Sequence, residues 1–167
     1  MDCNPELIAA AQNNTAKLGF SNRFALHTGE LADTRFLENL RMEASPVQLV
    51  MANPPWRLVG SGRLPATEAR RKALFGDKGT FPLFASAASS LLEEDGRFAC
   101  IISPDRLQDM LAALNGAGLT PYLLQYIHKQ KTSPATFVLI EARKGAHAKP
   151  SVAEPIALYG PERFFTL

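Results

Sequence analysis

The sequence predicts an α/β fold built on a mostly parallel sheet, and three observations support this. Apolar runs typical of strands alternate with stretches of helical periodicity along the chain. The run from Val47 to Ala52 is almost entirely apolar, as expected for a buried strand of a parallel sheet. The last two strand candidates follow each other with no helix between them, so we expect a reversed strand at the sheet edge.

Helices are expected where apolar residues recur at helical spacing. The first has Asn4 as a candidate N-cap and Pro5 in its first turn, and Gly19 ends it. The predicted helices cover residues 5–18, 34–41, 81–92 and 104–117.

Strands are expected at the intervening apolar runs, at residues 24–27, 47–52, 97–103, 123–128 and 136–143. Only the short polar segment 129–134 separates the last two, which should therefore pair antiparallel. In sheets of this class ligands lie beyond the carboxyl ends of the strands, and the loop after Ala52 is the richest candidate.

Composition is that of one ordinary globular domain: 167 residues, 46% hydrophobic, net charge +2. Cys3 and Cys100 lie far apart and outside any CxxC pair, so reduced thiols are expected rather than a zinc site or a disulfide. No metal site is expected. The sequence has neither an apolar run of membrane-spanning length nor a signal pattern, which predicts a soluble cytoplasmic protein.

The loop after the predicted strand 47–52 reads Asn53-Pro54-Pro55-Trp56. The prolines stiffen the turn, and the Asn53 side-chain oxygen and the Pro54 carbonyl are two acceptors that could hold both hydrogens of an exocyclic aromatic amine. Such a nitrogen would become pyramidal and present its lone pair to a methyl donor, while Trp56 stacks on the base. The alternative is an ordinary Asn-Pro turn with a core-capping Trp. The strand before the loop and the basic segment behind it favour the functional interpretation.

Positive charge is concentrated directly after this loop. Residues 57–78 hold six basic and two acidic side chains, a net charge of +4 that suits a phosphate-bearing substrate. A second patch lies between the last two strands. A solvated surface helix that binds nothing is the alternative interpretation. The predicted nucleic-acid contacts are Arg57, Arg63, Arg70, Arg71, Lys72, Lys129 and Lys131.

Asn-Pro-Pro followed by an aromatic residue resembles the catalytic motif of amino-methyltransferases that act on adenine N6, cytosine N4 or protein glutamine. Asp2 with the helix after it, and Thr28-Gly29-Glu30-Leu31, resemble two cofactor motifs of the class I methyltransferase fold. The segments 62–71, 94–98 and 128–145 resemble bacterial valine-tRNA adenine-N6 methyltransferases, and the similarity covers nearly the whole chain.

The resemblance implies a Rossmann-like sheet and S-adenosylmethionine as cofactor. Asp2 would accept hydrogen bonds from its ribose, Glu30 (in place of the more usual aspartate) and Leu31 would lie beside its adenine, and Asn53 would contact it as well. Catalysis would rest on Asn53, Pro54, Pro55 and Trp56, and the substrate would be an adenine of tRNA. RNA is favoured because unpaired loop bases need little flipping energy.

The family's first strand and glycine-rich turn have no counterpart in this sequence, which suggests residues 1–145 as a partial methyltransferase domain and 146–167 as a C-terminal tail. Met1 would then be an internal methionine taken as a start, or the chain a true short product. Two other enzyme activities stay open, methylation of DNA adenine and of protein glutamine. A non-catalytic nucleic-acid-binding remnant and an unstable fragment are the remaining alternatives.

Overall fold

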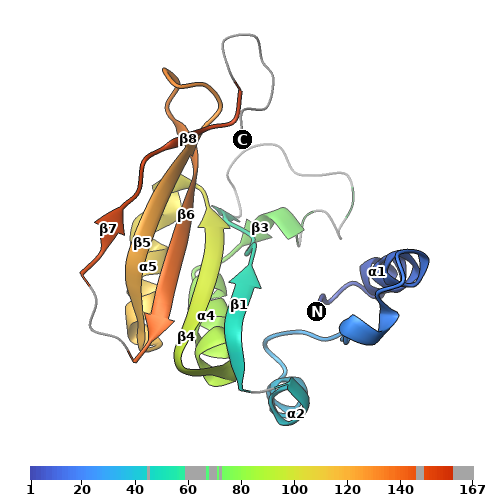
Figure 1. Ribbon diagram of the computed structural model, residues 1–167. Helices are drawn as coiled ribbons and strands as arrows, with labels where there is room; N and C mark the ends of the chain where they lie inside the picture. The colour runs from blue at the N-terminus through green and yellow to red at the C-terminus, as the bar shows by residue number, and fades with distance from the viewer. Residues whose placement is uncertain (45, 59–66, 68–70, 72, 146–148, 160–167) are drawn as a thin grey trace. The chain divides into compact units, whose positions relative to one another are not determined.

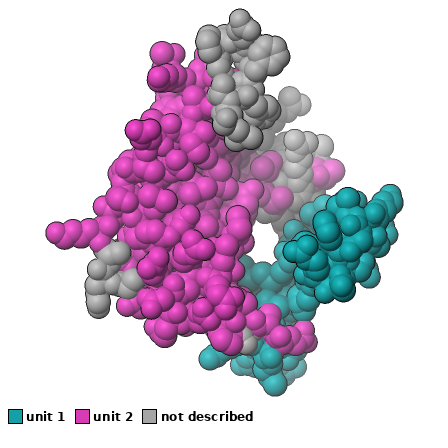
Figure 2. Space-filling view, viewed as in Figure 1, with its two compact units in different colours: residues 1–42 teal, residues 43–167 magenta. Residues whose placement is uncertain are grey.

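The computed structural model describes residues 1–44, 46–58, 67, 71, 73–145 and 149–159, which fall into two compact units. The first covers residues 1–42 and the second residues 43–167 (Figure 2).

The first unit holds helix α1 (Pro5–Lys17), the 3-10 turn η1 (Ser21–Arg23) and most of helix α2 (Thr34–Ala44). Both helices lie where the sequence predicts them, and the Asn4 side chain caps α1 by accepting a hydrogen bond from the Glu6 amide.

The strand predicted at residues 24–27 does not form. The segment has no ladder partner, and only one isolated parallel bridge, between Asp2 and Thr28, is present beside it. Short apolar runs are ambiguous because a strand also needs a neighbour to accept its backbone hydrogen bonds.

The second unit is built on a six-stranded sheet of β1 (Val47–Ala52), β4 (Leu92–Ile102), β6 (Ala135–Lys144), β5 (Leu119–His128), β7 (Ser151–Val152) and β8 (Ile156–Ala157). The order is β1-β4-β6-β5-β7, and β8 also pairs with β5. All these strands run in one direction except β6, which confirms the mostly parallel α/β class and the predicted antiparallel pair β5–β6.

The sequence suggested a reversed strand at the edge of the sheet, but in the structure the reversed strand lies in the interior. β6 lies between β4 and β5 and is antiparallel to both. Chain order puts β6 after β5, but the short connection lets β6 fold back into the interior of the sheet.

Helices α4 (Thr80–Leu91) and α5 (Leu107–Gly116), with the 3-10 turn η2 (Pro104–Arg106) before α5, cover one face of this sheet (Figure 1). The small residues Ala85 and Ala88 let α4 approach the strands closely. The largest fully buried side chains of this core are Phe81, Phe98, Ile102, Met110, Leu114, Leu119 and Ile140.

Strand β1 has the predicted bounds but is not buried on both faces. Val50 and Ala52 pack against the core, whereas Met51 is 76% exposed and Leu49 is 42% exposed. Successive side chains of a strand point to opposite faces of the sheet, so a run of apolar residues does not by itself show that both faces are buried.

Two smaller features complete the second unit. β2 (Arg57–Leu58) and β3 (Phe75–Gly76) form a short parallel pair next to the end of β1. Residues 151–157, within the predicted tail, add β7 and β8 to the sheet through β5. Among the described residues, no helix combines the length and the apolar character that a bilayer crossing requires.

Candidate active site

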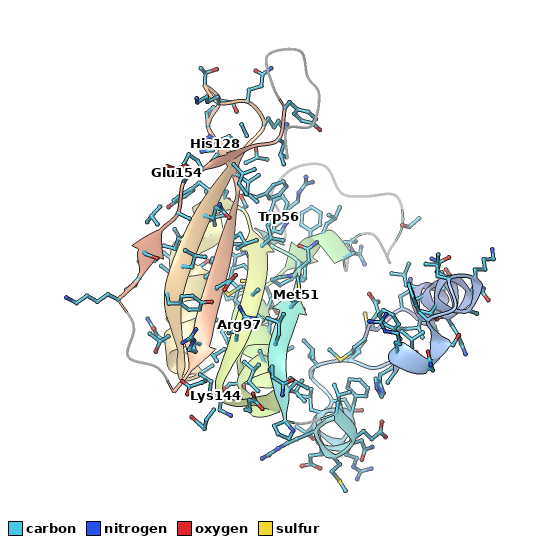
Figure 3. All side chains as sticks on the ribbon, in the orientation of Figure 1. Met51, Trp56, Arg97, His128, Lys144 and Glu154 are labelled. Atoms are coloured by element: carbon cyan, nitrogen blue, oxygen red, sulfur yellow. The ribbon has the colours of Figure 1, made fainter. Side chains whose placement is uncertain are left out.

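Three loops of the second unit lie at one edge of the sheet. Because β1, β4 and β5 run in the same direction, their carboxyl ends meet there. The loops are residues 53–56 after β1, 103–106 after β4 and 129–134 after β5. Figure 3 shows Trp56 and His128 toward this edge and Lys144 at the opposite one.

The loop after β1 combines a buried anchor with an exposed amide. Pro54 is fully buried and Pro55 is half-buried, which fixes the backbone of the turn. Asn53 is exposed, and its side chain makes no hydrogen bond within the part of the chain that the structure describes. The amide is therefore held on a stiff turn with its donors and acceptor available to a ligand.

Gly76 supports this turn from β3, and sequence reasoning missed it. A Cβ atom at this position would lie 2.7 Å from the Pro55 carbonyl oxygen and 2.6 Å from Thr80 Oγ1. Only a glycine lets β3 come this close to the loop. The signal in the sequence, a lone glycine between Phe75 and Asp77, says nothing about which residue it approaches.

Trp56 is half-buried and has neighbours on more than one side. Its ring meets that of Phe137 edge to face, with 6.0 Å between the centroids and 74° between the planes. The Arg57 guanidinium carbon lies over the Trp56 ring, 5.1 Å from its centroid. A base can therefore stack on this face only after Arg57 has moved aside.

A second residue missed by sequence reasoning is Arg106, at the end of η2. Its side chain is 4% exposed, and its Nη1 donates a hydrogen bond of 2.9 Å to the Trp56 carbonyl oxygen. The two residues are fifty positions apart, so no local pattern joins them.

Of the predicted nucleic-acid contacts, three basic residues lie at this edge. Arg57 is exposed beside Trp56, and Lys129 and Lys131 are exposed on the loop after β5. That loop is held by hydrogen bonds between Gln130 and Ser133. Arg71 is exposed, with its amide bonded to the Thr67 carbonyl oxygen. Three other predicted contacts lie outside the described residues, Arg63, Arg70 and Lys72.

The residues predicted to hold the cofactor belong to the first unit, except for Asn53. The Asp2 carboxylate accepts a hydrogen bond of 2.8 Å from the Asn4 amide, and the backbone of Asp2 bonds to Gly29. Glu30 is exposed and Leu31 half-buried in the segment that follows. The structure thus brings the Asp2 and Thr28–Leu31 segments together within this unit.

A separate groove of about 670 Å³ lies between α4 and α5. Its lining is mainly apolar and small, and none of it comes from residues 53–56, so the groove does not define the site. The described residues contain no group of three or more His, Cys, Asp or Glu side chains that could hold a metal ion.

Comparison with protein families found no family model that matches the chain, and no curated protein matches its sequence. Solved structures do match. A predicted O-methyltransferase from Agrobacterium tumefaciens superposes with a TM-score of 0.70 at 19% identity, over 98% of this chain and 70% of that one.

Two further structures match with lower scores. An O-methyltransferase family 2 protein from Planctomyces limnophilus, in complex with apigenin, has a TM-score of 0.53 at 16% identity, over 86% of this chain and 41% of that one. A protein assigned as a modification subunit of a type I restriction enzyme from Vibrio vulnificus YJ016 also has a TM-score of 0.53, at 12% identity, over 93% of this chain and 35% of that one. These similarities establish a methyltransferase-like Rossmann fold for the chain.

Proposed function

We propose that this chain carries the substrate-binding part of an S-adenosylmethionine-dependent N-methyltransferase whose acceptor is the exocyclic amine of adenine in RNA, with tRNA as the proposed RNA. The observation that carries the proposal is the loop of residues 53–56. It presents an exposed, unpaired Asn53 amide beside a fixed aromatic ring, at the ligand-binding edge of a methyltransferase-like sheet.

The arrangement suits an aromatic amine because that nitrogen is a poor nucleophile while its lone pair is delocalised. The Asn53 Oδ1 atom and the Pro54 carbonyl oxygen would each accept one amine hydrogen and favour a pyramidal nitrogen. The freed lone pair would attack the methyl carbon while the carbon–sulfur bond of the sulfonium donor breaks, and the methylated amine would then release its extra proton to water. Trp56 would hold the base by stacking, a contact worth about 1–3 kcal/mol.

Asp2, Glu30 and Leu31 fit a role in cofactor binding. Asp2 is a half-buried carboxylate whose one described side-chain bond is to the Asn4 amide, which leaves acceptor capacity for ribose hydroxyls. Thr28–Leu31 lies alongside it through the Asp2–Thr28 bridge. When bound there, S-adenosylmethionine would supply an activated methyl group.

RNA is proposed as the substrate because exposed cations lie at the same edge of the sheet as the loop. Arg57, Lys129 and Lys131 are exposed at the same edge as Asn53, and the segment 57–78 has a net charge of +4. Phosphates bind such an edge by ion pairing with counterion release. A neutral glutamine peptide would not require this charge.

The test is transfer of a labelled methyl group from S-adenosylmethionine to unmodified tRNA by the complete natural polypeptide that carries this sequence. Asn53→Ala should abolish transfer, because one of the two acceptors is lost. Asn115→Ala is the matched control, since Asn115 is an exposed asparagine near the carboxyl end of α5. This variant should leave the rate of transfer unchanged. Transfer by Asn53→Ala at the wild-type rate would contradict the proposed role.

The same assay decides between substrates. A higher rate on duplex DNA or on a glutamine-containing peptide than on tRNA would replace RNA by that substrate. Transfer to a phenolic hydroxyl, the kind of group present in the apigenin bound to the Planctomyces protein, would point to an O-methyltransferase instead. Salt-dependent RNA binding with no transfer and no cofactor affinity would favour a non-catalytic binding protein.

A further inference from the structure

Arg106 is a buried cation that links the active loop to helices α4 and α5. Burying a guanidinium costs several kcal/mol unless partners replace its water, and this one has three. Its Nε atom lies 2.7 Å from Asp109 Oδ2, and its guanidinium carbon lies 4.4 Å from the centroid of the Phe81 ring. The third partner is the Trp56 carbonyl oxygen, at 2.9 Å from Nη1.

The contact with Trp56 completes a pair of anchors around the loop. Pro54 fixes one end by full burial, and Arg106 fixes the carbonyl of Trp56 at the other end. The Pro54 carbonyl and the Trp56 α-carbon, to which the indole side chain is attached, lie between these two anchors. A shift of the Trp56 peptide would therefore move the ring and the neighbouring acceptor together.

We propose that Arg106 is a positioning residue, which sets the geometry of residues 53–56 through its bond to the Trp56 carbonyl. Its consequence for methyl transfer rests on the function proposed above, whereas its effect on Trp56 does not. Arg106 reaches the loop from the neighbouring parallel strand, so β4 and η2 would determine where the substrate base can stack.

The chemistry of the side chain explains why an arginine is needed. A planar guanidinium can donate to Asp109 through Nε, donate to Trp56 through Nη1 and lie on the Phe81 ring in one conformation. A lysine ammonium is a point charge at the end of a flexible stem and cannot keep all three contacts at once. Arg106→Lys is therefore expected to retain the charge and to lose the positioning.

Trp56 provides a direct readout because it is the only tryptophan in the chain. In Arg106→Met the unbranched side chain can still pack on Phe81 but donates no hydrogen bond. We expect acrylamide to quench Trp56 fluorescence in this variant more strongly than in the wild type, and the emission maximum to shift to longer wavelength. Arg106→Lys should show the same shift with a melting temperature nearer to that of the wild type.

Activity gives the second readout. Loss of one hydrogen bond to a charged group should lower kcat for methyl transfer about 10- to 100-fold, with little change in KM for RNA. Asp109→Asn is a control for the ion pair, because its amide oxygen can still accept from Nε, and it should keep the wild-type quenching. Arg97→Met removes an exposed arginine of β4 and should also leave quenching unchanged.

The outcomes separate the two proposals. Wild-type quenching and kcat in both Arg106→Met and Arg106→Lys would overturn the role of Arg106 and leave the proposed function intact. Stronger quenching in these variants, combined with no methyl transfer by the wild type to any substrate, would support the positioning role and remove the proposed function. A kcat loss that appears only together with a lost melting transition in both variants would mean that Arg106 serves folding alone.

Discussion

At the scale of single residues, Gly76 is the tightest point around the candidate site. A Cβ atom there would lie 2.7 Å from the Pro55 carbonyl oxygen, so Gly76→Ala must push β3 or the loop aside. We expect a loss of about 1–3 kcal/mol in the free energy of unfolding, as for other overpacked sites, together with a shift in Trp56 emission. Urea unfolding followed by fluorescence measures both.

Gly116 is the matched control for this change. It is also a glycine, at the last residue of α5, and a Cβ atom there would meet nothing within 4 Å. Gly116→Ala should therefore be neutral or slightly stabilising, since alanine loses less entropy than glycine in a helix. Equal stability of the two variants would mean that the approach at Gly76 relaxes without cost.

Cys100 and Cys3 should differ sharply in reactivity. Burial raises the pKa of the Cys100 thiol from 9.0 to about 12, whereas Cys3 is exposed. The thiolate is the reactive form, so iodoacetamide at pH 8 should label one thiol in the native chain and two in urea, as counted by mass spectrometry. Rapid labelling of both native thiols would contradict the buried position.

The same pKa shift has a consequence for stability. Below pH 9 the Cys100 thiol is protonated in both the folded and the unfolded chain, so it has no effect. Between pH 9 and about 12 the unfolded chain ionises first, and the contribution of Cys100 to stability falls as the pH rises. Cys100→Ala should therefore lose less stability than the wild type over this range.

The residues of the site differ in how far sequence could predict them. Asn53 to Trp56 are contiguous, and their residue types alone indicate the chemistry, so the pattern itself predicts a site after β1. Arg106 and Gly76 act through contacts with backbone carbonyls that are distant in sequence, and only the folded chain brings them together. Exposure of Asn53 and the position of Arg57 over Trp56 likewise depend on packing.

At the scale of elements, periodicity predicted the long helices and strands but not their surroundings. β4 begins at Leu92, before the predicted start at Arg97, because the segment read as a stop stays within the strand through an irregular stretch, where the register against β1 shifts and Asp95 adopts a left-handed φ of 62°. Residues 24–27 have the composition typical of a strand but no neighbouring strand to pair with among the described residues. Strand pairing and burial depend on residues far away in the chain, which local propensity does not report.

One contact between elements should contribute measurably to stability. Lys144, at the end of β6, donates hydrogen bonds of 2.9 Å and 2.8 Å to the carbonyl oxygens of Ser89 and Leu92, and so caps the end of α4. Lys144→Met keeps the stem and removes both bonds, which should cost about 1–3 kcal/mol in urea unfolding. Lys149→Met, at an exposed position, is the control and should change little.

At the scale of the whole molecule, the two units differ in how much core they possess. Within residues 1–42 only Leu40 is buried, and α1 has no buried residue, whereas the second unit holds the large core around Phe81, Phe98 and Ile140. A helix of 13 residues is marginal when packing does not support it. Amide hydrogen exchange should therefore be fast in α1 and slow in β4 and β6.

This difference allows a test of the cofactor assignment. A ligand that binds only the folded form of a unit stabilises it by mass action, so saturating S-adenosylmethionine should slow exchange in α1 and in Thr28–Leu31. Asp2→Ala should remove this protection, because the ribose would lose its acceptor, whereas Glu38→Ala, at an exposed position of α2, should not. If the cofactor leaves exchange in residues 1–42 unchanged in the complete polypeptide, Asp2, Glu30 and Leu31 do not form its site, and the methyl donor must be held elsewhere.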